Sequence, residues 1–171
     1  MTSNTETSQV FSGLILLTGE DKAGISKALF ETLSPFAVSV IDIDQIIIKQ
    51  RLILTVQIQL NPDHKEAIEA DLNTLADELQ VDIASLFSTS EAPSVPSNPV
   101  IMTITSPKML PSYLQIIASA IHDLGGNIEK FDRHSVQPLS LSIHVSGVSG
   151  QEITKAIAQM EPEIQSMLTV A

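Results

Sequence analysis

The stretch that decides the fold is Leu14–Asp44, LILLTGEDKAGISKALFETLSPFAVSVIDID. It predicts a short buried strand at Leu14–Leu17, a tight loop, a helix and a second strand. Apolar residues of the helix recur at i, i+3, i+4 and i+7, the spacing of a stripe that packs on a sheet. The stripe consists of Ile25, Ala28, Leu29, Thr32, Leu33 and Phe36.

The loop between strand and helix, Gly19–Gly24, carries the first candidate site. Asp21 is predicted to cap the helix by accepting backbone N–H bonds. Gly24 has no Cβ, so another group can approach the backbone where free N–H groups and the helix dipole favour a carboxylate. The alternative is that Gly19 and Gly24 only form a tight turn, because glycine is common between a strand and a helix.

Composition excludes several classes of function. The chain has 171 residues and a net charge of −11, with only nine scattered lysines and arginines, so no polyanion-binding surface is expected. It contains no cysteine, which excludes disulfides, thiol nucleophiles and thiolate metal sites. Charged residues make up 17%, where about 25% is usual, and this shortage suggests that a partner covers part of the surface.

Targeting signals are not apparent in the sequence. The N-terminus, MTSNTETSQV, lacks the basic region and apolar core of a signal peptide, and residues 1–9 are expected to be disordered. No apolar run approaches the roughly 18 residues of a spanning helix. These features, with the absence of cysteine, predict a cytoplasmic location.

Two similar units follow one another along the chain. Residues 10–89 read as strand, helix, strand, strand, helix, strand: Arg51–Leu60 alternates like a half-buried strand, Asn61-Pro62-Asp63 starts the second helix, and Val81–Phe87 is the last strand. The segment Ser88–Pro99 holds three prolines among small polar residues and predicts a linker, at residues 90–98. Residues 99–171 repeat the same order.

The repeat has a numerical register. Laying Ser39 on Asn127 gives an offset of 127 − 39 = 88, which also places Leu29 on Ile117 and Ile43 on Phe131. In the second unit, Gly125-Gly126 is predicted to end a helix, and one continuous helix is predicted from Ser149 to Ile164. The predicted class is α+β, with two ferredoxin-like βαββαβ units. Their strands are apolar on both faces, so the units should pack on each other or on a second chain.

These residues resemble the ACT domain, a small regulatory ligand-binding fold. Thr18–Ile25, TGEDKAGI, is similar to the T-G-x-D-x-P-G loop in the N-terminal ACT region of long bacterial phosphoserine phosphatases. The second unit resembles the second ACT repeat of the same family. The matching segments are Lys27–Leu33, Asp44–Ile48 and Arg51–Leu54 in the first unit, and Gly125–Ile128 and Gln137–Val145 in the second.

The resemblance implies a homodimeric regulatory module of serine biosynthesis that binds a small amino acid, L-serine. The extended linker Ser88–Pro99 should let ACT units exchange between chains. Backbone N–H groups of the loop would hold the ligand carboxylate. The implied ligand-binding residues are Asp21, Lys22, Ala23, Gly24 and Ile25, with Asn127 and Ile128 from the same chain or another. Asn127 could instead be a turn-forming asparagine. The alternative function is a free-standing ACT pair that regulates other proteins, with or without a ligand.

The chain departs from this family in several places. Ala23 stands where the loop often has proline, and the second loop, Ser106–Pro111, has no glycine. The chain stops at Ala171, where the haloacid-dehalogenase-type catalytic domain of these phosphatases would begin. The chain itself is therefore expected to have no catalytic residues, metal site or cofactor; magnesium is implied only for that catalytic domain.

Other candidate chemistry is weaker. Asp42 and Asp44 mimic a phosphatase D-x-D motif, but the accompanying lysine and acidic pair are missing, so we interpret them as a solvated strand face. Of the four histidines, only His134 and His144 could approach each other, across a hairpin, and neither has metal-ligand spacing with a carboxylate. No nucleophile elbow of the form G-x-S-x-G occurs.

Overall fold

The computed structural model describes residues 9–91 and 98–171. The chain divides into two compact units, within residues 1–94 and 95–171. The predicted disorder of residues 1–9 falls almost wholly outside the described residues, and so does most of the predicted linker. No helix in the described ranges is long and apolar enough to cross a membrane.

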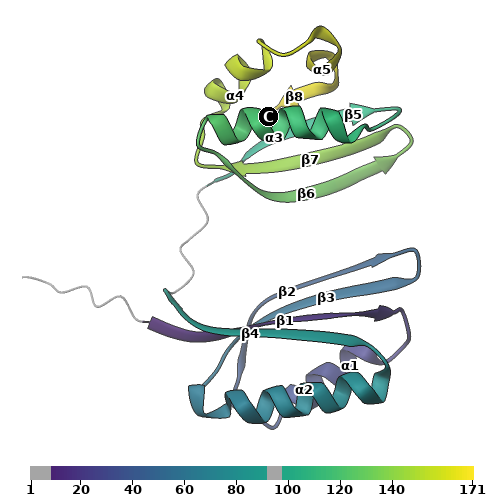
Figure 1. The fold of residues 1–171 in the computed structure, drawn as a ribbon, viewed down its shortest axis with the longest axis vertical. Coiled ribbons are helices and arrows are strands. Elements are labelled where there is room, and N and C mark those ends of the chain that lie inside the picture. Colours follow the sequence, from purple (N-terminus) through teal and green to yellow (C-terminus); the bar gives the residue numbers. More distant parts are fainter. Residues whose placement is uncertain (1–8, 92–97) are drawn as a thin grey trace, which may run out of the picture. The chain divides into compact units, whose positions relative to one another are not determined.

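The first unit has the predicted βαββαβ order (Figure 1). Its elements are β1 (Gln9–Glu20), α1 (Ile25–Leu33), β2 (Ser39–Ile48), β3 (Arg51–Gln59), a 3₁₀ turn (Pro62–His64), α2 (Lys65–Leu79) and β4 (Asp82–Glu91). The sheet order is β2-β3-β1-β4, with antiparallel neighbours throughout, which is the ferredoxin-like topology. Figure 1 shows both helices on one face of this sheet.

The helices and the sheet enclose one apolar core. Ile25, Leu29 and Leu33 of α1 are buried, as the stripe predicted, and Ile68, Leu72 and Leu75 of α2 are buried with them. In β3, Leu52, Leu54, Val56 and Ile58 face this core while the residues between them are half-buried, so the predicted alternation is confirmed.

The first strand differs from its prediction. We expected Leu14–Leu17 to be short and buried, but β1 runs from Gln9 to Glu20 and only one of its faces is covered. Ile15 and Leu17 are fully buried, whereas Leu14 is 47% exposed. The reason is geometric: successive side chains of a strand point to opposite faces, and the helices cover only one of them.

Local turn chemistry explains two connections. Lys49 and Gln50 join β2 to β3 with φ of 47° and 65°, the left-handed conformations that a two-residue type I′ hairpin turn requires. Asn61 accepts a hydrogen bond from the Asp63 N–H through its side chain at 3.0 Å, and Pro62 follows it, as predicted for the start of the second helix. The last strand continues to Glu91, beyond the predicted end at Phe87.

The second unit repeats the arrangement. Its elements are β5 (Val100–Ser106), α3 (Pro111–Asp123), β6 (Asn127–Val136), β7 (Leu139–Ser146), α4 (Gly150–Ile157), α5 (Pro162–Met167) and β8 (Leu168–Val170), with sheet order β6-β7-β5-β8. Gly125 has φ of 79° and its N–H donates to the His122 carbonyl, so the predicted Gly-Gly helix end is confirmed.

The continuous helix predicted from Ser149 to Ile164 is wrong. The structure has two helices, with a break at residues 158–161 before Pro162 at the start of α5. Proline lacks the N–H that an uninterrupted helix would need at this position. Ile153 and Ile164 are nevertheless both buried, so the apolar pattern was correct although the backbone was not.

The predicted offset of 88 holds for β2 and β6, and both strands bulge at equivalent points, between Val40 and Asp42 and between Ile128 and Lys130. A second irregularity occurs in β6 alone, between Arg133 and Ser135. The central strands have a different offset: the row Ile43–Val56–Ile15 across the first sheet matches Phe131–Ile143–Met102 in the second, where 143 − 56 = 87 and 102 − 15 = 87.

Candidate ligand-binding site

The strongest candidate site is the N-terminus of α1. The N-cap is Gly24, with φ of 93° and ψ of −6°, and no side chain caps the helix. The first bond of the helix runs from the Ala28 N–H to the Gly24 carbonyl at 2.9 Å. The N–H groups of the first turn therefore have no side-chain acceptor, and such groups, with the helix dipole, favour an anion.

The prediction that Asp21 caps this helix is wrong. Asp21 lies three residues before the N-cap, its side chain is exposed, and its N–H donates to the Gln50 carbonyl at 2.7 Å. A carboxylate cap must come from the N-cap residue itself, and glycine has no side chain to supply it. The helix terminus is left open as a result.

The space beside this terminus is empty. A Cβ built on Gly24 meets no atom within 4 Å, and Asp21, Lys22 and Ala23 are all exposed. Lys22 forms an ion pair with Glu20 at 3.3 Å, and its side chain is 52% exposed. Solvent therefore screens its charge at the edge of the candidate site. Ile25 is 3% exposed, so it can offer a ligand only its backbone N–H.

Two contacts fix the position of the loop. The bond from Asp21 to Gln50 attaches it to the β2–β3 turn, and Ser26 in the first turn of α1 donates to the Gln45 side chain at 3.0 Å. Gly19, which we considered as part of a tight turn, lies inside β1 opposite Leu52. A Cβ there would come within 2.6 Å of Val81, so this glycine permits a close approach of two segments.

The predicted partner residues lie in the second unit. Asn127 is exposed and begins β6 directly after the helix-ending glycines, while Ile128 is half-buried and pairs with Val145. Asn127 is thus the first residue of a strand and not part of a turn.

Within one unit, these two kinds of position cannot meet. In the first unit, Glu20 pairs with Arg51 at one end of β3, while Ser39, the counterpart of Asn127, pairs with Gln59 at the other end. A strand of this length spans about 30 Å at 3.3 Å per residue. A site that combines the loop with an Asn127-type residue therefore needs two units or two chains.

The corresponding loop of the second unit is closed. Ser106 is 2% exposed, and its hydroxyl donates to the Lys108 carbonyl at 2.9 Å and accepts from the Lys108 N–H at 3.3 Å. The N-cap of α3 is Leu110, followed by Pro111. The 88-residue offset pairs Gly24 with Ser112, but Ser112 lies inside α3 because that helix begins earlier. This agrees with the prediction that the second loop is a poor ligand site.

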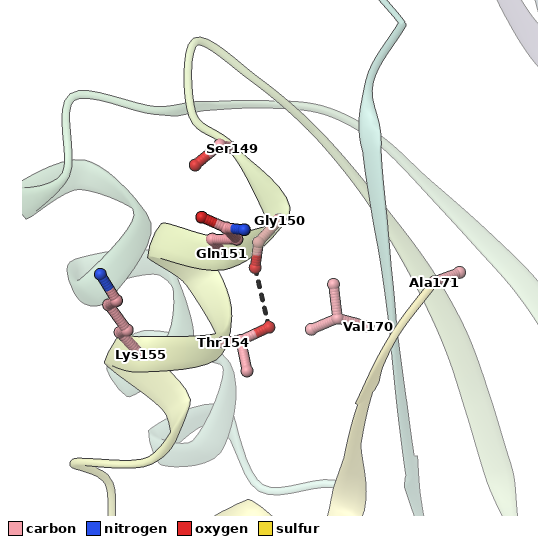
Figure 2. Close-up of a pocket in the computed structure, with 7 residues that line it drawn as sticks. All are labelled: Ser149, Gly150, Gln151, Thr154, Lys155, Val170 and Ala171. Atoms are coloured by element: carbon pink, nitrogen blue, oxygen red, sulfur yellow. Dashed lines mark hydrogen bonds between the residues drawn. The ribbon is translucent and has the colours of Figure 1, made fainter.

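A pocket of about 590 Å³ lies beside α4 and β8 in the second unit, lined by Gln151, Thr154, Lys155, Val170 and neighbouring residues (Figure 2). Sequence reasoning missed it. The two hydroxyl groups of its lining are engaged: Ser149 forms a reciprocal capping box with Glu152, and Thr154 donates to the Gly150 carbonyl at 2.8 Å. The hydrogen bonds from Ser149 hold the pKa of Glu152 below its usual value.

The histidines bind separate partners. His144 lies 2.9 Å from Asp132, and Lys130 lies 3.0 Å from the other oxygen of the same carboxylate. The hydrogen bond from Lys130, with the charge of Lys130, lowers the pKa of Asp132. His134 instead hydrogen-bonds Ser142. In the described residues, no group of three or more acidic, histidine or cysteine side chains could hold a metal.

The D-x-D pair behaves as interpreted from the sequence. Asp42 and Asp44 are both exposed on β2, and Asp42 accepts a bond from the neighbouring Ile43 N–H at 2.9 Å. This is a local hydrogen bond between a surface carboxylate and the backbone of the next residue in β2.

Comparison with known proteins places this geometry in a family. The ACT domain family matches residues 13–85, so the first unit is an ACT domain. The second unit lies outside this match but has the same topology, and the chain is an α+β tandem of two βαββαβ units.

Among curated proteins, the chain is similar to the phosphoserine phosphatase of Streptomyces coelicolor, with 25% identity over 158 residues. The match covers 91% of this chain and 38% of that protein, so the chain spans less than two fifths of its relative.

Two solved structures share the fold over almost the whole chain. A candidate glycine cleavage system transcriptional repressor has a TM-score of 0.69 at 11% identity, covering 95% of this chain and 96% of its own. An unknown protein from Galdieria sulphuraria has a TM-score of 0.65 at 17% identity, covering 94% and 95%. At these identities the likeness concerns the fold alone.

Proposed function

We propose that this chain is a regulatory module that binds a small amino acid, L-serine, and acts within a phosphoserine phosphatase of cytoplasmic serine biosynthesis. The observation that carries the proposal is the open N-terminus of α1, where Gly24 caps the helix without a side chain and the adjacent space is empty. The similarity to a phosphoserine phosphatase over 91% of the chain supports the choice of serine.

The ligand carboxylate would accept hydrogen bonds from the first-turn N–H groups of α1, beginning with Ile25. Its ammonium group would meet side-chain oxygens, for which the exposed Asp21 and Asn127 are suited. Because Asn127 belongs to the other unit, Asn127 and Ile128 would complete the site from a second unit, in the same chain or in a partner. In a homodimer, with or without exchanged units, the second unit that completes the site can come from the same chain or from the partner chain.

Calorimetric titration of the chain with each of the twenty amino acids tests the proposal. We expect saturable binding of L-serine and weaker binding of larger amino acids. If none of the twenty binds, the chain is an interaction module without a ligand, and the proposal fails. Preferential binding of another amino acid would retain the sensor function and reject serine.

A further inference from the structure

The two sheets differ in the side chains on their open faces, which are the faces opposite the helices. One row across the first sheet reads Asp44–Thr55–Leu16–Ala84, and the equivalent row of the second reads Asp132–Ser142–Thr103–Thr169. Leu16 and Ala84 thus correspond to two threonines. The same fold has an apolar surface in one unit where it has a polar one in the other.

The polar face of the second unit is satisfied internally. Ser142 contacts both Thr103 and His134, and Thr105 hydrogen-bonds Ser140 at 2.9 Å. Such a face can remain in contact with water, because these polar groups have hydrogen-bond partners.

The first unit instead exposes what we call the leucine patch: Leu14, Leu16, Ala84 and Leu86. The three leucines are 47%, 39% and 66% exposed, and Ile46, 48% exposed, extends the patch toward β2. The charged residues of this face lie at the border of the patch: Asp42, Asp44, Glu20 and the Arg51–Asp82 pair. An uncharged apolar centre with a polar rim is the anatomy of a protein interface.

The shape of the leucine patch indicates its occupant. Leu86 is the most exposed of the three leucines, and it lines a hollow of about 210 Å³ together with Leu14, Leu16, Ala84 and Ser85. An exposed leucine at an apolar hollow allows a self-complementary contact: under a two-fold axis, Leu86 of each copy would enter the hollow of the other. The patch carries no charge, so two acidic chains can meet there without placing like charges in contact.

We propose that the leucine patch is the interface with a second copy of this chain, formed between first units. The inference rests on the homodimer proposed above and names its surface. The patch lies on the sheet face opposite α1, so the interface leaves the N-terminus of α1 accessible. Sedimentation measures dimer formation, and calorimetry measures serine binding.

Sedimentation equilibrium of the full chain provides the test. The unmodified chain should sediment at twice its mass of 18.4 kDa. Leu86→Lys should raise the dimer dissociation constant roughly a hundredfold, because the two-fold axis places two lysines in apolar hollows. The matched control, Thr169→Lys, alters the position equivalent to Ala84 on the polar face of the second unit and should leave the mass unchanged.

Cross-linking gives a second measurement that does not depend on destabilising the dimer. Because the chain has no cysteine, a mixture of Leu86→Cys and Ala84→Cys chains can form a disulfide only between copies. We expect a mixed covalent dimer under mild oxidation, and none with Thr169→Cys in place of Ala84→Cys.

The outcomes separate the two proposals. If Leu86→Lys still sediments as a dimer and the cysteine pair does not cross-link, the leucine patch is not the interface, although the homodimer stands. If the unmodified chain is a monomer, both the homodimer and its surface are rejected. Calorimetry measures serine binding separately, and a monomer that still binds serine would exclude a site completed by Asn127 of a partner chain.

Discussion

The Asp21 N–H donates a 2.7 Å hydrogen bond to the Gln50 carbonyl, which ties the candidate ligand loop to the β2–β3 turn. Gln50 has φ of 65° and its neighbour Lys49 has φ of 47°. The position of the loop therefore depends on a turn conformation that neither side chain favours.

Lys49→Asn combined with Gln50→Gly should stabilise the first unit. Asn-Gly is the preferred pair of a type I′ turn, and the gain should be about 1 kcal/mol in the free energy of unfolding. Urea denaturation measures it. Gln50→Pro is the opposing variant, since proline cannot adopt positive φ, and equal stability of the two variants would contradict the turn assignment.

Gly24→Val should abolish serine binding with less effect on folding. The valine would occupy the open space beside the first-turn N–H groups and would be strained at φ of 93°. Losing two charge-assisted hydrogen bonds, each about 1.5–3 kcal/mol, would weaken binding roughly a hundredfold or more. The expected loss of stability is about 1–2 kcal/mol.

Calorimetry and urea denaturation of the same variant measure these two effects. The control is Ser112→Val, at an exposed position in the first turn of α3, which should bind serine as the unmodified chain does. Unchanged affinity in Gly24→Val would place the site elsewhere, and a collapse of folding would assign this glycine a structural role.

Gly19→Ala should destabilise the first unit without altering the loop. Its Cβ would lie 2.6 Å from a methyl group of Val81, and relief requires β1 and the start of β4 to separate. Overpacking of this kind costs about 1–3 kcal/mol. Adding Val81→Ala should recover part of that loss in thermal denaturation; a double variant no more stable than Gly19→Ala would mean that the contact is not the cause.

Ser149→Ala should cost the second unit about 1 kcal/mol, the usual value of a helix cap. The effect should depend on pH, because hydrogen bonds from Ser149 lower the pKa of Glu152 below its ordinary value in the folded chain. A group with a depressed folded pKa contributes stability that is present above its unfolded pKa and lost as pH falls through the folded one.

Denaturation of the unmodified chain and of Ser149→Ala between pH 7 and pH 3 tests whether the stabilisation by the cap is lost as the pH falls. The difference in stability between them should be constant near neutral pH and shrink in acid. With Glu152→Gln as the background, the difference should no longer vary with pH; a persistent variation would assign it to another carboxyl group.

The elements of both units could be predicted from local patterns. Helical spacing identified the buried faces of α1 and α2, alternation identified β3, and Asn61 and Gly125 marked helix boundaries through their own backbone and side-chain chemistry. The duplicated register of β2 and β6 was also visible, because equivalent core positions preserve apolar character. Errors at Asp21 and at the break between α4 and α5 arose where several local signals competed, and the hydrogen-bonding geometry decided between them.

The sequence by itself determined the two βαββαβ units and pointed to the loop before α1, since periodicity and turn chemistry act over a few residues. Only the tertiary structure decided that Gly19 serves a close approach to Val81, that Gly24 and not Asp21 caps α1, and that the loop and an Asn127-type residue lie at opposite ends of a sheet. It also decided which strand residues share the open face, because strand pairing sets the rows across each sheet, and the offset between the units is 88 for β2 and β6 but 87 for the central strands. These relationships join residues far apart in the chain, and their physical cause is strand pairing and helix coverage, which local sequence patterns do not contain.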